Sequence, residues 1–240
     1  MELGEPFEAR HSELVAPALL ADGTEVVVKV RLPDDFESEH EAEALHFWNG
    51  DGAVRLLAHD PEHRALLIER CRPGTPLGTR YADEDLEVAA ALMRRLWRPA
   101  PPEVGWWRLE DVAERWLGEL PERYSGRILD EALDALRALA PTQEGVVLCH
   151  QDFHGGNVLR AEREPWLAID PKPIVAEPAY DTVAIVRDAG PSLAELRRRL
   201  DALAGLLGLD RERMRLWGIA KSLAWDNPDE AELFSEVGSR

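Results

Sequence analysis

The residues best suited to chemistry lie in one stretch, Cys149-His150-Gln151-Asp152-Phe153-His154-Gly155-Gly156-Asn157. Asp152 and Asn157 are five positions apart on a loop that follows the apolar run 145–149, and a second apolar run, 166–169, ends at Asp170. One carboxylate can accept a hydroxyl proton, while an amide and a second carboxylate can hold Mg²⁺ beside phosphate oxygens. The spacing therefore indicates phosphoryl transfer, with Asp152 as the base and Asn157 and Asp170 as magnesium ligands.

Two other interpretations of this stretch stay open. Asp and Asn side chains often hydrogen-bond their own backbone, so Asp152 and Asn157 are also compatible with a structural turn. His150, Asp152 and His154 are compatible with a zinc cluster, but the pattern lacks the closed four-ligand spacing of structural zinc and no cysteine pair accompanies it. The magnesium interpretation is favoured because Asp170 follows thirteen residues after Asn157, at the end of an apolar run.

A lysine within an apolar strand is a further candidate. Lys29 lies in Val26-Val27-Val28-Lys29-Val30, where a buried charge is costly unless it is paired. Only three of the 28 basic residues are lysines (Lys29, Lys172 and Lys221), so a lysine at such a position suggests a specific role. The alternative is a lysine on an edge strand that reaches solvent. A partner is expected among the glutamates that follow: Glu37, Glu39, Glu41 and Glu43.

These motifs resemble those of the antibiotic-phosphorylating relatives of protein kinases, and among them the streptomycin 6-kinase (aminoglycoside and hydroxyurea kinase) family. The resemblance runs from about Asp22 to Asp226 and is most specific at residues 145–181. It implies an α+β, bilobal, protein-kinase-like fold, with a small β-rich N-terminal lobe (1–70) and a larger helical C-terminal lobe (71–240). It also implies an enzyme that uses ATP and Mg²⁺ to phosphorylate a hydroxyl group of a small molecule such as streptomycin.

The resemblance assigns roles to the residues that bind the nucleotide. Lys29 matches the strand lysine that contacts the phosphates. Glu41 matches its glutamate partner best, in Glu41-Ala42-Glu43-Ala44-Leu45, and Glu43 is the alternative. Lys172, in an Asp-Pro-Lys motif, is expected to neutralise phosphate oxygens or to hold Asp170, unless it is only solvated. The adenine is expected to meet the backbone that follows the strand 66–70.

Further roles concern the catalytic loop. Asp181, in a Pro-Ala-Tyr-Asp motif, is expected to open a helix and to brace the loop, and His150 is expected to pack against it. His154 matches the family pattern, but the pattern implies no role for it. Gln151 departs from the family, which has glycine before the base, and its side chain is expected to narrow the loop or to alter access.

A second departure lies at the N-terminus. Only about twenty residues precede Asp22, with Gly4 as their sole glycine, so the N-terminal lobe is expected to be shortened and to lack a phosphate-cradling glycine pattern. This motivates an alternative function, a non-catalytic nucleotide-binding or scaffold protein descended from a kinase. A kinase for another small metabolite is a further alternative. A protein kinase is disfavoured, since Asp-Phe-Gly and Ala-Pro-Glu are missing after the loop.

Composition limits the partners. The net charge of −18 repels nucleic acid and anionic membranes, and it favours a cationic acceptor, although acidity also simply keeps a protein soluble. No apolar stretch is long enough to span a bilayer, and the first ten residues do not form a leader, so a cytoplasmic location is expected. Cys71 and Cys149 lie in or beside apolar runs and are expected to be reduced. The sequence does not indicate an oligomeric state.

Periodicity and turn signals predict the elements that position these residues. The first seventy residues are expected to be mostly strands, with an apolar run at 14–20, strands at 25–31, 53–58 and 65–69, and a helix at 37–49. After a connector at 71–76, helices are predicted at 83–97, 108–120, 127–140, 180–188, 193–207 and 211–225.

Overall fold

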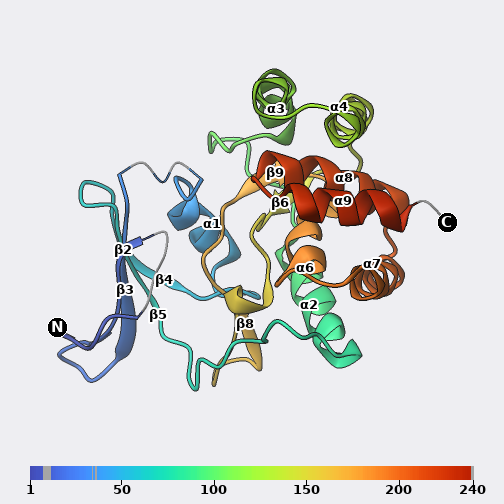
Figure 1. Cartoon of the computed structure of the whole chain (residues 1–240). Helices are drawn as coiled ribbons and strands as arrows, with labels where there is room; N and C mark the ends of the chain where they lie inside the picture. Colours follow the sequence, from blue (N-terminus) through green and yellow to red (C-terminus); the bar gives the residue numbers. More distant parts are fainter. Residues whose placement is uncertain (8–11, 34, 36, 239–240) are drawn as a thin grey trace. The chain divides into compact units, whose positions relative to one another are not determined.

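The computed structural model describes residues 1–7, 12–33, 35 and 37–238 (Figure 1). The chain forms two compact units, one of residues 1–77 and 156–173, the other of residues 78–155 and 174–240. The connector after residue 70 belongs to the first unit, because it pairs with the strand that begins at Val158. Gly74 N–H donates to Arg160 O at 3.0 Å and Leu77 N–H to Val158 O at 2.8 Å. The lobe limits predicted at 1–70 and 71–240 stay a prediction.

The first unit is built on an antiparallel sheet in the order β1-β2-β3-β5-β4. Its strands are β1 (Glu2–Leu3), β2 (Ser12–Leu19), β3 (Glu25–Arg31), β4 (Leu56–Asp60) and β5 (Ala65–Glu69). β3 and β5 have the predicted bounds, and the β-branched valines of β3 suit a strand with neighbours on both sides. The strand predicted at 53–58 begins later, because Ala53 forms a bridge to Ala168 instead.

One helix and a hairpin complete this unit. Helix α1 (Glu41–Trp48) begins four residues after the predicted start, since residues 37–40 form turns. It ends at Asn49 and Gly50, which both adopt the left-handed backbone conformation that ends many helices. The hairpin is formed by β7 (Val158–Arg160) and β8 (Trp166–Ala168), which pair antiparallel with Val158 opposite Ala168.

The second unit is mainly helical. Its longer helices are α2 (Asp83–Leu96), α3 (Leu109–Arg123), α4 (Arg127–Leu139), α7 (Leu193–Leu207), α8 (Arg211–Ala224) and α9 (Pro228–Val237). The predicted helix 180–188 is two short helices, α5 (Pro178–Asp181) and α6 (Val183–Arg187). Two short strands, β6 (Val147–Cys149) and β9 (Ile174–Ala176), pair beside them, and the 3-10 turns are 140–142 and, at the junction of the two units, 155–157.

Helix α8 lies at the centre of this unit. It contacts α4, α5, α6, α7 and α9, and α9 runs beside it (Figure 1). The close approach needs a glycine, because a Cβ on Gly218 would lie 2.3 Å from the ring of Phe234 on α9. α9, which the sequence did not predict, begins with a proline in its first turn, as helices often do.

Two further predictions can be compared with the fold. Cys71 and Cys149 are buried and form no disulfide, as expected. Within the described residues, no helix has both the length and the apolar character that crossing a membrane requires.

Candidate functional site

A buried lysine pairs with two acids in the first unit. Lys29 Nζ donates to both carboxylate oxygens of Glu41, at 2.9 and 2.7 Å, and also to Asp170 Oδ1. Lys29 is 4% exposed and Glu41 is fully buried. Burial would lower the pKa of Lys29, but the charges of Glu41 and Asp170 outweigh it and raise that pKa above its ordinary value. The ammonium is therefore held in its charged form.

This arrangement decides between the interpretations of Lys29. β3 lies between β2 and β5, with Lys29 opposite Val15 and Leu66, so the edge-strand alternative is wrong. Among the four candidate glutamates, Glu41 is the partner, because it occupies the first turn of α1 and points from the helix toward β3.

The hairpin brings the two predicted magnesium ligands together. Beyond the β7–β8 pair, Ile169 N–H donates to Asn157 O at 2.9 Å, so Asp170 follows directly after the residue that faces Asn157. Asp170 adopts a left-handed backbone conformation (φ 56°), and its side chain is 39% exposed, whereas Asn157 is buried. Lys172, two residues on, forms an ion pair with Glu37 at 3.0 Å.

The donor set fits magnesium better than zinc. An amide oxygen and a carboxylate are hard ligands, and Mg²⁺ commonly uses one or two protein carboxylates together with phosphate oxygens. Within the described ranges, no group of three or more His, Cys, Asp or Glu residues is arranged to hold a metal ion.

The loop that carries Asp152 belongs to the second unit and begins with a tight turn. Asp152 N–H donates to His150 O at 2.8 Å, which closes a three-residue turn around Gln151. Gln151 adopts φ 67°, a left-handed conformation that glycine accepts without steric cost. Glycine, which the resemblance predicts at this position, would adopt this backbone geometry more easily than glutamine does.

Asp181 braces the start of the loop, as predicted. Its carboxylate accepts hydrogen bonds from Gln151 N at 2.6 Å and His150 N at 3.2 Å, and from Trp97 Nε1 at 2.8 Å. Asp181 ends α5 instead of opening a helix. The His150 ring packs edge-on against Phe153, with centroids 5.4 Å apart, in keeping with its expected packing role.

A second carboxylate braces the end of the same loop. Gly155 N–H donates to Tyr81 Oη at 2.7 Å and to Asp188 Oδ2 at 3.3 Å, and the Tyr81 hydroxyl also donates to Asp188. Burial and this bond to Asp188 raise the pKa of Tyr81, so the phenol stays protonated. A Cβ on Gly155 would lie 1.9 Å from Gly78 O, so only glycine fits here.

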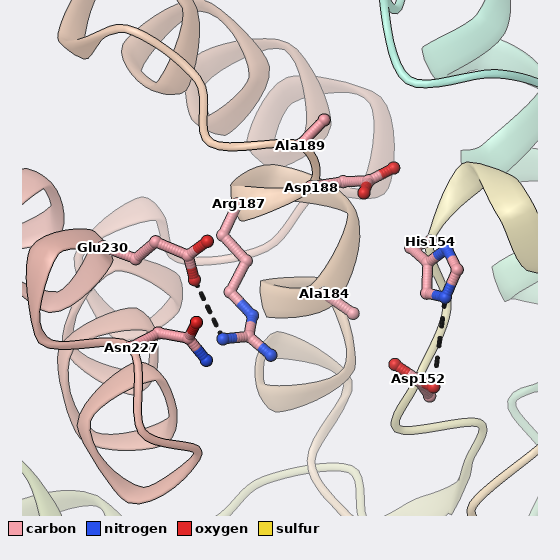
Figure 2. Close-up of a pocket in the computed structure, with 8 residues that line it drawn as sticks. All are labelled: Asp152, His154, Ala184, Arg187, Asp188, Ala189, Asn227 and Glu230. Carbon is pink, nitrogen blue, oxygen red and sulfur yellow. Dashed lines mark hydrogen bonds and ion pairs between the residues drawn. The ribbon is translucent and has the colours of Figure 1, made fainter. Parts of the chain in front are cut away.

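Asp152 lines an acidic hollow of about 150 Å³ in the second unit (Figure 2). Asp152 and His154 lie on one side, with 4.0 Å between Oδ2 and Nε2, and Arg187, Asn227 and Glu230 lie on the other. The remaining lining residues are Ala184, Asp188 and Ala189. Arg187 pairs with Glu230 at 2.9 Å. The lining therefore holds three carboxylates and one guanidinium.

Sequence reasoning found part of this lining. Asp152 and His154 were identified from their motif, but Arg187 and Asp188 were not. The sequence did contain one feature that could have indicated Asp188: it lies seven residues after Asp181, in the same short segment. In the structure both carboxylates accept hydrogen bonds from the loop that carries Asp152. The predicted site residues thus form two groups. Lys29, Glu41, Asn157, Asp170 and Lys172 lie in the first unit, and Asp152 lies in the second.

Comparison with solved structures identifies the fold. The choline kinase LicA from Streptococcus pneumoniae matches with a TM-score of 0.70 at 12% identity, covering 100% of this chain and 88% of that one. A thermostable mutant of aminoglycoside phosphotransferase APH(4)-Ia, in a ternary complex with ADP and hygromycin B, matches with a TM-score of 0.65 at 16% identity, covering 100% and 95%. At these identities the likeness shows the fold alone, and it confirms the expected α+β, protein-kinase-like fold.

Comparison of sequences identifies the family. The chain is 41% identical over 218 residues to a hydroxyurea phosphotransferase from Kitasatospora aureofaciens, covering 87% of this chain and 63% of that protein, which is less than two thirds of its length. It is 36% identical over 239 residues to a streptomycin 6-kinase from Streptomyces glaucescens, covering 91% and 76%. Residues 1–228 match the profile of the family described as aminoglycoside/hydroxyurea antibiotic resistance kinase. This chain belongs to that family.

Proposed function

We propose that the protein transfers the γ-phosphoryl group of ATP to a hydroxyl group of a small molecule, with an aminoglycoside such as streptomycin as the leading acceptor. The observation that carries this proposal is the buried Lys29–Glu41 pair in contact with Asp170. A charged lysine held between two acids beside a hard-oxygen metal site is the arrangement that nucleotide phosphates need.

The first unit supplies the nucleotide contacts in this proposal. Lys29 contacts the phosphates, Glu41 fixes its ammonium, and Asn157 and Asp170 would hold Mg²⁺. The bound metal would neutralise phosphate charge. Lys172, anchored by Glu37, adds positive charge two residues from Asp170.

Asp152 acts on the acceptor. Its carboxylate accepts the proton of the acceptor hydroxyl as that oxygen forms a bond to the γ-phosphorus, and the bond from phosphorus to the β–γ bridging oxygen breaks to release ADP. Because the transition state is loose, the direction of the hydroxyl matters more than strong basicity. The hydrogen bonds from both ends of the loop to Asp181 and Asp188 supply that direction.

The hollow beside Asp152 supports a cationic acceptor. Asp152, Asp188 and Glu230 outnumber Arg187, which is already paired. The volume of about 150 Å³ is below the roughly 300–1,000 Å³ of pockets that enclose a drug-sized ligand, so the hollow would take one charged ring or guanidinium of a larger acceptor.

A second candidate acceptor is hydroxyurea. It is favoured by the 41% identity to a protein named hydroxyurea phosphotransferase, and a neutral molecule of this size would fit the hollow entirely. The two acceptors differ in charge, and so added salt distinguishes them. Capture of a cation by exposed carboxylates weakens with ionic strength, whereas capture of a neutral molecule does not.

The test is phosphate transfer from labelled ATP with Mg²⁺ to streptomycin, hydroxyurea, choline and a neutral sugar. We expect transfer to streptomycin, with a KM that rises with added KCl. Transfer to hydroxyurea alone, without a salt effect, would identify hydroxyurea as the acceptor in place of streptomycin and would leave the proposed phosphoryl transfer unchanged. If Mg-ATP raises the melting temperature and no acceptor is phosphorylated, the non-catalytic alternative is supported instead.

A further inference from the structure

The third lysine of the chain lies buried beneath the catalytic loop. Lys221, on α8, is fully buried, and its Nζ donates to Gln151 O at 2.5 Å. The ammonium also lies 4.4 Å from the ring centroid of Tyr180 and 4.7 Å from that of Trp225. A lysine is rarely buried without a specific partner, and here the Nζ donates to the backbone carbonyl of the residue before Asp152.

That carbonyl belongs to the residue in the left-handed turn. Turns closed by a hydrogen bond between residues i and i+2 with positive φ at the centre are rare and strained. Asp181 holds the N–H of Gln151 and Lys221 holds its C=O. A carboxylate and an ammonium therefore hydrogen-bond the two peptide groups on either side of the strained residue. Asp152 is the next residue in the chain.

The surroundings make the charge of Lys221 sensitive to pH. Burial, and the positive charge of Arg187, lower the pKa of this amine to about 7, while nearby acids oppose the shift. The titratable and charged groups that face it come from four elements: Asp181 at the end of α5, Arg187 on α6, Cys149 at the end of β6 and Asp152 on the loop. Burial keeps Cys149 protonated by raising its pKa.

We propose that Lys221 is a positioning residue for Asp152: its ammonium fixes the turn at Gln151, and this support weakens when the amine loses its proton. The inference rests on the proposed function. A neutral amine still donates a hydrogen bond, but it loses the attraction of Asp152 and Asp181 and the cation–π contacts with the two rings. Phosphate transfer should therefore decline as the pH rises through the pKa of Lys221.

The low lysine count allows a direct test. Protein labelled with ¹³C at lysine Cε should give three signals, and that of Lys221 is recognised by the ring-current shift from Tyr180 and Trp225 and by its loss in K221R. We expect this signal to titrate near pH 7 and the alkaline limb of wild-type kcat to share its midpoint. Both midpoints are measured on the wild-type protein.

Variants separate positioning from packing. K221M should lower kcat by roughly ten- to a hundredfold, the loss expected for a misplaced catalytic group, with little change in the KM for ATP. K221R keeps a charge and should recover part of kcat without the alkaline limb near pH 7. Q151G should partly rescue K221M, because glycine adopts the turn without strain. S222A is the matched control for α8, since the buried Ser222 hydroxyl has no hydrogen-bond partner among the described residues.

The outcomes are distinguishable. A wild-type kcat that stays level from pH 6 to 9 while Lys221 titrates, or a K221M variant that loses thermal stability but keeps kcat, would overturn the inference alone. If wild-type protein phosphorylates no acceptor, the proposed function fails and this inference fails with it. A matched midpoint together with rescue by Q151G would support the positioning role.

Discussion

Removal of the buried ammonium is the most informative perturbation of the first unit. In K29M the two acids that Lys29 contacts lose their shared counter-ion, and burial and the charge of Asp170 raise the pKa of Glu41 on α1. Asp170 is partly exposed and can be solvated, but Glu41 cannot reach water without moving the helix. The loss of folding free energy in K29M therefore arises mainly at Glu41.

The magnitude follows from the distance and the burial. Unit charges 2.7 Å apart attract by about 6 kcal/mol at an effective dielectric constant of about 20, and burial of each ion costs several kcal/mol, so the intact pair contributes little net stability. Loss of one partner leaves the other uncompensated, which costs about 3–5 kcal/mol. For a chain of this size that corresponds to a fall in Tm of about 6–20 °C.

The assay is a double-mutant cycle. K29M, E41Q and K29M/E41Q are compared by thermal unfolding without nucleotide. Phosphate transfer by each variant is followed in parallel as the release of ADP. We expect the double variant to be more stable than the sum of the single losses predicts, by at least about 2 kcal/mol, because the uncompensated charge is removed. Additive losses, or a K29M variant as stable as wild type, would refute the idea that a buried ion pair organises this unit.

Three further predictions concern both units. D152N should abolish phosphate transfer and leave Mg-ATP binding intact, as measured by isothermal calorimetry; near wild-type turnover would reject Asp152 as the base. Mg²⁺ and ATP together should raise Tm more than either alone, by about 2–3 kcal/mol of stability at a hundredfold excess over Kd, and N157A should remove this synergy. The folded-state pKa of Lys221, about 7, lies below its unfolded value, so the unfolded chain binds more protons between about pH 7 and 10. Stability from this group should rise with pH across that window in urea unfolding, and K221M should lack the rise.

Some predictions depended only on local order along the chain. Spacing along the chain identified the candidates in the loop at 149–157, Asp170 after its apolar run, and Lys29 within a strand. This is possible because residues close in sequence are also close in space. The bounds of β3, β5 and α7 were predicted correctly for the same reason: alternation and turn signals are local. The start of α1 was predicted four residues too early, because residues 37–40 form turns.

The partners of these residues were decided by tertiary structure. Four glutamates were candidates for Lys29, and the late start of α1 selected Glu41 while Glu37 was left in a turn, where it meets Lys172. Lys221 reaches the loop from 70 residues away, and Asp188 from 33. Contacts at such separations depend on how helices pack around α8, and no pattern within a short window records that packing. The sequence by itself predicted which residues carry the proposed chemistry, and tertiary packing determined which charged groups contact them.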